Sequence, residues 1–371
     1  MRVVSLSPAI VGKQLGKTIY NNTGKVLLTK GTTLTPSYLD ALRRHGYNSV
    51  YILNELVPEI EVDDWINEET RQIAVQEVKK LMHKTLQGNA RKVDLAAITS
   101  IVEQMIAEMD GNSNVIFGLS VLRTVDNYTF VHSTNVAVLS LLLGSTLHYS
   151  RDELRTLGIG AILHDLGKIK TPPEILNKPG SLDGGEMSIM QEHARAGFDL
   201  LRERLDVSLF SAHIAFQHHE RLDGSGYPRG VSGANIHEYG LIGAVADVYD
   251  AITSDRVYRP RNEPLKAAEF LVNGKGIHFE PRLVAKLLSK VALYPNGTIV
   301  LLKNNCLAVV SGQNPDDIRY PKVALVSGSD RQPVELQFFQ TTPADPIQLV
   351  LLDFPDGFVN RWKSTTRPAN G

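Results

Sequence analysis

The spacing of apolar positions changes several times along the chain and predicts its elements. In residues 1–56, "GKVLLTKGTTL" indicates two short strands joined by a Lys-Gly turn. The next stretch, "TPSYLDALRRHG", predicts a short helix, because Thr35 can cap it, Pro36 fits its first position and Gly46 can end it. "NSVYIL" then returns as a strand. Residues 1–56 are therefore expected to form a small α/β module.

Residues 57–126 show a helical pattern. "WINEETRQIAVQEVKKLMHKTL" has apolar residues near helical spacing and contains neither Pro nor Gly. In "LAAITSIVEQMIAEM" the residues that share one helical face are Ile98, Ile101, Val102, Met105, Ile106 and Met109. We expect these helices to link the first module to the rest of the chain, and a homodimer to form through the N-terminal and helical regions.

The pattern stays helical over residues 127–290 and becomes strand-like over 291–371. "GTIVLLKNNCLAVVSG", "KVALVSG", "VELQFF" and "IQLVLLDF" are rich in apolar and β-branched residues, with a hairpin turn expected at Asn304–Asn305. The predicted fold class is mainly α: a helical bundle core, a small α/β N-terminal unit and a β-rich C-terminal appendage, which is either a barrel or a sheet.

Composition limits the classes of function and of binding site that the protein can have. A chain of 371 residues is too long for one ordinary core and suggests two or three domains. With 39 basic and 40 acidic residues, the net charge of −1 argues against binding to a nucleic-acid backbone. A single cysteine excludes internal disulfides and cysteine-rich metal sites. The start "MRVVSLSPAI" lacks a signal-peptide pattern, and the apolar stretch "VAVLSLLLG" is too short to span a bilayer, so we expect a cytoplasmic protein not inserted in a membrane.

Histidines are concentrated in the middle of the chain, with seven of the eleven between residues 132 and 219. His132 is followed on the same helical face by the apolar Val136 and Leu139, so it is expected to point inward. His193 lies near apolar positions of the predicted helix "EMSIMQEHARAGFDLL". Each histidine alone would be explained as a core residue, and only the group requires another explanation.

Two pairs of adjacent residues, each containing histidine, strengthen the interpretation of this group as a metal site. His164 and Asp165 stand in the apolar run "LGIGAILHDLG", which predicts a helix ended or turned by Gly167. Because adjacent helical side chains diverge by about 100°, this pair is expected to contact metal ions and not simply each other. His218 and His219 lie where a helix runs into the loop "ERLDGSGYP", and side-by-side imidazoles suit a divalent metal.

Two aspartates complete the candidate group. Asp247 lies on the inner face of the apolar helix "GLIGAVADVYDAITS", where a carboxylate requires a metal ion or an arginine. Asp250 follows on the same side, and an ordinary ion pair with Arg256 is an alternative for it. Nitrogen and carboxylate ligands without thiolate suit iron, manganese, cobalt, nickel or zinc, and the residues alone do not select among these metals.

The order of these motifs resembles a known family. His132, "HDLGK", His193, "HHERLDGSGYP" and "ADVYDAITSDRVYR" together are similar to the HD-GYP subgroup of the HD phosphohydrolase superfamily, over about residues 115–290. The resemblance implies a helical HD-type core and a metal-dependent phosphodiesterase that hydrolyses cyclic di-GMP to pGpG or GMP. It also implies attack on phosphorus by a hydroxide that bridges two metal ions.

The resemblance assigns residues to roles. One ion would be held by His132, His164, Asp165 and Asp247, and the other by Asp165, His193, His218 and His219. Catalysis would involve Asp165 and Lys168, and the substrate would be contacted by Lys168, Arg256, Arg259, Tyr227 and Asp250. Iron or manganese is favoured over cobalt, nickel or zinc. Tyr128 stands where some members carry a Glu that helps to hold a third ion, so two ions are expected.

Two kinds of alternative remain. The domain could hydrolyse another nucleotide, such as cyclic GMP-AMP, a nucleoside triphosphate or (p)ppGpp, although the GYP loop argues against the last two. It could instead bind cyclic di-GMP with negligible turnover and signal through a partner. Product analysis after incubation with the nucleotide distinguishes the enzyme from the binding module.

Overall fold

The computed structural model describes two compact units. The described residues are 1–21, 25–47, 49–54, 56, 57, 59, 60, 65–89, 95–110, 128–254, 264–351, 353–355 and 357–366. The terminal unit comprises Met1–Asp64, Asn114–Asp126 and Ser289–Gly371, and the helical unit comprises Trp65–Ser113 and Asn127–Leu288. Whether the four sequence segments are separate domains stays a prediction. In the described residues, no helix has the length and apolar character needed to cross a membrane.

The N-terminal part of the terminal unit is a small α/β arrangement. Its elements are β1 (Arg2–Ser5), η1 (Pro8–Ile10), β2 (Ile19–Tyr20), β3 (Val26–Leu28), α1 (Pro36–Arg44) and β4 (Ser49–Ile52). β1 pairs antiparallel with β4, and β2 with β3. Helix α1 starts as expected, because the side chain of Thr35 accepts a hydrogen bond from the amide of Tyr38.

The predicted hairpin across Lys30–Gly31 is wrong in its pairing. The chain does turn there, but β3 pairs with the earlier strand β2. The segment after the turn bridges Gln14 through Thr33. Leu15 and Leu34, which flank this bridge, are fully buried in the module's core, so burial of these side chains decides the pairing.

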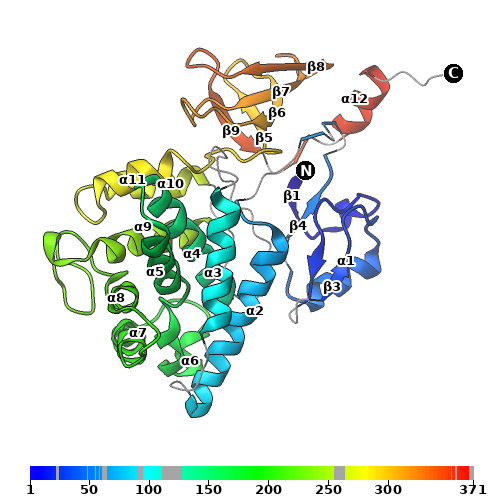
Figure 1. Cartoon of the computed structure of the whole chain (residues 1–371). Helices are drawn as coiled ribbons and strands as arrows, with labels where there is room; N and C mark the ends of the chain where they lie inside the picture. Colours follow the sequence, from blue (N-terminus) through cyan, green and yellow to red (C-terminus); the bar gives the residue numbers. More distant parts are fainter. Residues whose placement is uncertain are drawn as a thin grey trace. The chain divides into compact units, whose positions relative to one another are not determined.

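The C-terminal part of the terminal unit is a five-stranded antiparallel sheet with strand order β8-β7-β6-β5-β9. The strands are β5 (Ile299–Leu302), β6 (Leu307–Gly312), β7 (Lys322–Ser327), β8 (Pro333–Gln340) and β9 (Ile347–Leu351). Asn305 adopts φ 68° between β5 and β6, which confirms the turn expected there. Because β8 and β9 are the two edges, the appendage is an open sheet and not a closed barrel (Figure 1).

The N-terminal and C-terminal segments share one apolar core. Leu56 and Val57 pack in the same buried cluster as Ile299 of the sheet and Phe358 of helix α12 (Phe358–Thr366). Trp362 of α12 donates a hydrogen bond from Nε1 to the carbonyl of Val334. The sequence pattern did not reveal this joint core, because it depends on contacts between opposite ends of the chain.

The helical unit contains the candidate site. Its α-helices are α2 (Glu68–Lys84), α3 (Ala96–Asp110), α4 (Tyr128–Thr146), α5 (Arg151–Ile162), α6 (Pro173–Leu176), α7 (Gly184–Arg202), α8 (Leu209–Gln217), α9 (Glu238–Thr253), α10 (Pro264–Asn273) and α11 (Pro281–Leu288) (Figure 1). Short turns of other helix types are η2 (Thr85–Asn89), η5 (Leu166–Lys170) and η6 (Gly233–Asn235). Together with the terminal sheet, these helices confirm the predicted mainly α fold class.

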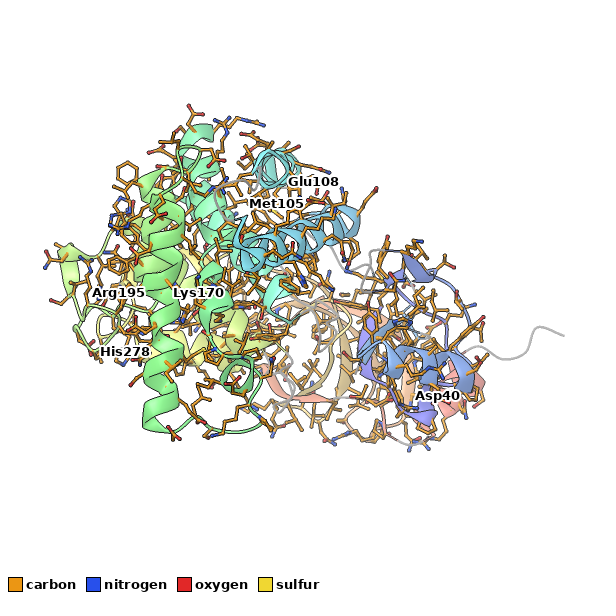
Figure 2. The ribbon with its side chains drawn as sticks, turned by 90° about the horizontal axis from the view of Figure 1, so that it is seen from below. Asp40, Met105, Glu108, Lys170, Arg195 and His278 are labelled. Atoms are coloured by element: carbon orange, nitrogen blue, oxygen red, sulfur yellow. The ribbon has the colours of Figure 1, made fainter. Side chains whose placement is uncertain are left out.

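Side-chain caps and one shared carboxylate set the helix starts. Ser150 and Glu153 form a reciprocal capping box at α5, and such a cap stabilises a helix by about 1 kcal/mol. Glu108 on α3, labelled in Figure 2, accepts hydrogen bonds from Asn67 and Thr70 at the start of α2. These bonds tie α2 to α3, and α2 packs in turn on α4. Helix α4 is buried over most of its length, so it forms the centre of the unit.

Candidate metal centre

His164 and Asp165 lie in a turn, which corrects the helix expected through "LGIGAILHDLG". Helix α5 ends at Ile162, and the chain continues into the 3-10 helix η5. Gly167 lets this turn lie directly against α7, because a Cβ at that position would collide with the carbonyl oxygen of His193. The turn therefore brings the HD pair beside the helix that carries His193.

Asp165 presents its two carboxylate oxygens to different histidines. Its Oδ2 is 3.4 Å from Nε2 of His164 and 3.8 Å from Nε2 of His132. Its Oδ1 is 3.5 Å from Nε2 of His193 and 3.9 Å from Nε2 of His218. These separations exceed ordinary hydrogen bonds, and they suit atoms that could coordinate a shared ion. The carboxylate of Asp165 thus faces two groups of histidine nitrogen atoms. The first group comes from His132 and His164, and the second from His193 and His218.

The first group is completed by Asp247 on α9. Its Oδ1 is 2.9 Å from Nε2 of His132 and 4.0 Å from Nε2 of His164. Ligand atoms of these three residues lie within 4.8 Å of one another, and all three side chains are buried. They come from α4, the HD turn and α9, so tertiary packing assembles the group.

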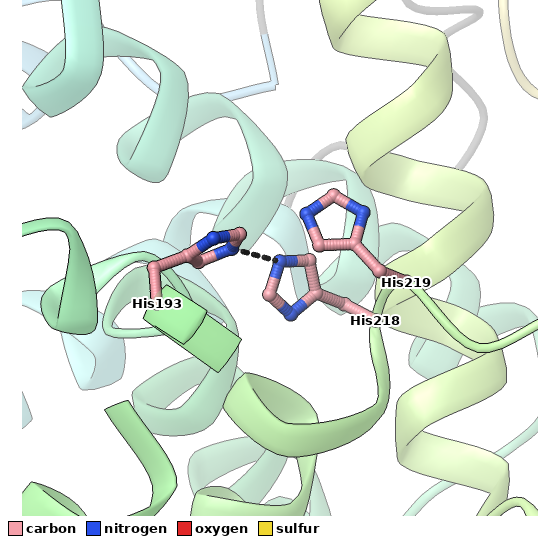
Figure 3. A group of neighbouring side chains, drawn as sticks. All are labelled: His193, His218 and His219. Carbon is pink, nitrogen blue, oxygen red and sulfur yellow. Dashed lines mark hydrogen bonds between the residues drawn. The ribbon is translucent and has the colours of Figure 1, made fainter. Parts of the chain in front are cut away.

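The second group consists of three imidazoles. His193 comes from α7, His218 caps the end of α8, and His219 follows it (Figure 3). The Nε2 atoms of His193 and His218 are 3.4 Å apart, as the dashed line in Figure 3 marks. The three residues offer ligand atoms within 4.8 Å of one another. The Nδ1 atom of His219 also lies 3.9 Å from Oδ2 of Asp247, which joins the second group to the first.

Four of the five histidines are oriented by a bond at Nδ1. The contacts are His132 to Asp250 Oδ2 at 2.6 Å, His164 to the Ala161 carbonyl at 2.8 Å, His193 to the Met190 carbonyl at 2.6 Å and His218 to the Ile214 carbonyl at 3.0 Å. In His164, His193 and His218 the acceptor is a carbonyl, so the proton sits on Nδ1 and the lone pair of Nε2 points into the cluster. Metal-binding histidines in proteins are held in this way. In His132, burial lowers the pKa, but hydrogen bonds to the carboxylates of Asp247 and Asp250 outweigh burial and raise the pKa to about 10, so a metal ion would have to displace the proton on Nε2.

The electrostatic surroundings keep several candidate ligands in their metal-binding forms. Burial lowers the pKa of His193 to about 4 and that of His218 to about 3, so both imidazoles are neutral at pH 7. Burial raises the pKa of Asp165, but the charge of Lys168 outweighs this and holds that pKa well below its ordinary value. Metal binding requires neutral imidazole and ionised carboxylate, which is the state these pKa values favour.

Two buried atoms inside the cluster lack a hydrogen-bond partner among the described residues. They are Nε2 of His164 and Oδ1 of Asp165. Leaving a buried polar atom unpaired is costly, so each of these atoms indicates a position beside which a cation belongs. The donor set contains nitrogen and carboxylate oxygen without sulfur, which suits first-row transition metals. The residues present therefore fit divalent metal ions.

Comparison with known proteins agrees with this geometry. Residues 121–283 match the HD domain family. Over 246 residues the chain is 34% identical to the cyclic di-GMP phosphodiesterase PA4108 of Pseudomonas aeruginosa, an alignment that covers 66% of this chain and 59% of that protein. Residues 121–283 thus match an HD domain, and the motifs that resemble the HD-GYP subgroup lie within this range.

Two further relatives differ in the nucleotide that their names specify. The cyclic di-GMP phosphodiesterase response regulator RpfG of Xanthomonas campestris is 42% identical over 148 residues, covering 40% of this chain and 39% of RpfG. The 3'3'-cGAMP-specific phosphodiesterase 2 of Vibrio cholerae is 38% identical over 161 residues, covering 43% of this chain and 31% of the relative. The chain thus spans about a third to three fifths of the length of these relatives.

The residues predicted to contact the substrate differ in burial and in their hydrogen-bond partners. Lys168 donates from Nζ to Oδ2 of Asp165 at 2.5 Å, and its side chain is 21% exposed, so it lies at the edge of the metal cluster. Asp250 is fully buried and accepts hydrogen bonds from His132 and Asn135. These contacts favour a role for Asp250 in orienting His132 over the substrate contact inferred from the resemblance. The predicted contacts Arg256 and Arg259 lie outside the described residues.

The GYP loop is held by Glu220, a residue to which the motifs assign no role. Its side chain is fully buried, and its carboxylate accepts hydrogen bonds from the amides of Arg229 at 3.0 Å and Val231 at 3.1 Å. The ring of Tyr227 stacks on that of His219, with centroids 4.5 Å apart. The loop therefore covers one histidine of the second group. The signal available was a Glu directly after the two histidines and before a Gly-rich loop.

Metal binding is expected to stabilise the helical unit. At a free concentration of about 100 times its dissociation constant, one ion bound only by the folded state adds about 2.7 kcal/mol to the free energy of unfolding. Adding manganese to chelator-treated protein should therefore raise the midpoint of thermal unfolding, measured by circular dichroism. Calcium prefers oxygen ligands and should leave the midpoint unchanged. Equal shifts with both cations would contradict a nitrogen-rich site.

Proposed function

We propose that the helical unit is a metal-dependent phosphodiesterase that hydrolyses cyclic di-GMP to pGpG or GMP. The observation that carries the proposal is the position of Asp165, whose two buried oxygens face separate nitrogen groups. This arrangement suits a carboxylate that bridges two ions, and pairs of divalent ions are a common device for phosphodiester cleavage. The named activity of several relatives supports the same reaction class.

The two ions would occupy neighbouring positions in the cluster. We assign one to His132, His164, Asp165 and Asp247, and the other to Asp165, His193, His218 and His219. When bound, such ions lower the pKa of a coordinated water to supply the nucleophile, and they neutralise charge on the phosphate. Iron or manganese is our preferred metal. We keep the number of ions at two, because Tyr128, at the position of the third-ion Glu, offers no carboxylate.

The remaining residues would bind and orient the substrate. The charge of Asp165 outweighs burial and raises the pKa of Lys168, so its ammonium group stays protonated. We assign it to a non-bridging phosphate oxygen, where it would stabilise the charge that increases in the transition state. Tyr227, stacked on His219, would border the substrate from the GYP loop. Arg256 and Arg259 remain our proposed partners of the second phosphate.

Buried side chains keep bulk water away from the cluster. His164 and Asp165 are fully buried, and His132 and His193 are at most 3% exposed. Electrostatic interactions are stronger where water is excluded, so fixed charges here act on the substrate more strongly than at the surface. Asp247 is about a tenth exposed, so with Lys168 it marks the edge from which a phosphate could approach.

Product analysis tests the proposed reaction. The manganese- or iron-loaded protein should convert cyclic di-GMP to linear pGpG or GMP, separated by ion-exchange chromatography. Chelator-treated protein is the control and should leave the substrate intact. Tightly bound but unchanged cyclic di-GMP would contradict the enzyme and support the binding-module alternative.

A second substrate is favoured by one comparison. The Vibrio cholerae relative is named as specific for 3'3'-cGAMP, so the same assay should be run with that dinucleotide at equal concentration. We expect a higher kcat/KM for cyclic di-GMP. A reversed ratio would retain the reaction class and change the proposed substrate. A homodimer through the N-terminal and helical regions and a cytoplasmic location stay predictions.

A further inference from the structure

Arg71 is a buried cation on helix α2, outside the residues assigned to the metal site. Its side chain is 1% exposed. Nη1 donates to Oδ1 of Asn135 at 2.9 Å, and Nε lies 3.7 Å from Oε2 of Glu68. Among the described residues, Nε and Nη2 have no hydrogen-bond partner. Burying a guanidinium group is costly, and one long ion pair with a partly exposed Glu does not explain it.

A chain of hydrogen bonds connects Arg71 to the metal cluster. Nδ2 of Asn135 donates to Oδ1 of Asp250 at 2.8 Å. Oδ2 of Asp250 contacts Nδ1 of His132 at 2.6 Å. Nε2 of His132 in turn lies 2.9 Å from Oδ1 of Asp247. Asn135 and Asp250 are fully buried, so water does not compete for these bonds.

The chemistry of Arg71 fixes the polarity of this chain. A guanidinium group only donates, so the amide oxygen of Asn135 must face Arg71 and its NH₂ group must face Asp250. The carboxylate of Asp250 accepts that bond on one oxygen and the Nδ1 proton of His132 on the other. Nε2 of His132 is thereby directed into the cluster, where it faces Oδ1 of Asp247.

We propose that Arg71 is a positioning residue for the metal centre, acting through Asn135 and Asp250 to orient His132. The inference rests on the proposed metal-dependent function. It makes α2 part of the catalytic domain, although the sequence assigned residues 57–126 to a linker.

Replacing Arg71 with Met tests the proposal by metal titration. Loss of a partner bonded directly to a ligating histidine typically weakens metal affinity about 10–100-fold. Arg71 acts two residues further out, so we expect Arg71→Met to weaken binding of one of the two ions by about 10-fold, the low end of this range. Arg71→Lys keeps a buried charge and a donor and should recover part of the affinity. The matched control is Lys80→Met on the same helix, because Lys80 is 61% exposed and pairs only with Glu77 among its charged neighbours in the described structure.

A second variant separates positioning from general stability. Asn135→Leu leaves Arg71 in place and breaks the chain, so it should weaken the same ion. In the double variant the affinity should fall no further than in the weaker-binding single variant, since both act on one chain. The ¹⁵N resonances of the His132 ring, recorded in the zinc-loaded protein, should change in both variants.

The outcomes distinguish this inference from the proposed function. Wild-type protein that binds no transition metal would overturn the proposed function itself. Wild-type protein that binds two ions, together with folded Arg71→Met and Asn135→Leu variants of equal affinity and unchanged His132 resonances, would overturn the positioning role alone. Circular dichroism establishes the fold of each variant, and Arg71→Lys supplies the comparison if Arg71→Met is unstable.

Discussion

The Asp165→Asn variant is expected to lose at least about 10³-fold in kcat for cyclic di-GMP and to lose bound metal, a scale comparable to removing one key charge-stabilising group from an active site. The substitution preserves the size of the side chain and removes its negative charge. An amide offers one weakly binding oxygen, whereas the carboxylate offers two oxygens to two nitrogen groups. The effect should therefore extend to both ions.

Elemental analysis and steady-state kinetics check this expectation. The metal content should fall from two ions per chain to fewer than one, while circular dichroism shows the wild-type helical content. Asp199→Asn is a suitable control, because Asp199 lies on the exposed side of α7 and pairs with Arg202. Retention of two ions and of activity in Asp165→Asn would show that Asp165 does not bridge the ions.

The Lys168→Gln variant is expected to retain two metal ions and to lose about 10²–10³-fold in kcat, a scale typical of removing one group that stabilises transition-state charge. Lys168 touches Asp165 but offers no lone pair while protonated, so it contributes charge and not metal ligation. KM should change less than kcat, because the interaction strengthens as the phosphate gains charge.

A neighbouring lysine provides the matched control for this variant. Lys170, labelled in Figure 2, lies in the same 3-10 helix η5, and its side chain is exposed. Lys170→Gln removes the same charge from the protein and should leave kcat within about twofold of wild type. Lys168→Arg should restore part of the lost rate. Loss of metal from Lys168→Gln would assign Lys168 to assembly of the centre instead.

Local chemistry made part of the fold predictable. The cap by Thr35, the hairpin turn at Asn305 and the inward face of α4 depend on residues close in sequence, so short patterns were sufficient. The pairing of β3 and the end of α5 were missed. In both cases burial against a distant segment overrides the local preference, as Leu15 does for the hairpin and the α7 backbone does beside Gly167.

In the candidate site, too, some residues could be predicted from local sequence patterns and others could not. The residue types in "HDLGK" and "HHERLDGSGYP" indicated nitrogen and carboxylate ligands before any contact was known. Asn135 carried a usable signal, since it is a polar residue in the apolar run after His132. Arg71 carried none, because it lies in an ordinary amphipathic pattern far from the motifs and its partner is 64 residues away.

The amino-acid sequence by itself determined which ligand atoms are available, their chemical class and the resemblance of the motifs to the HD-GYP subgroup. Only the tertiary structure decided which oxygen of Asp165 faces which histidine, and that Asp250 contacts Nδ1 of His132. The physical reason is separation along the sequence. Side-chain chemistry and helix periodicity are set within a few residues, whereas ligand geometry requires helices distant in sequence to pack within a few ångströms of one another.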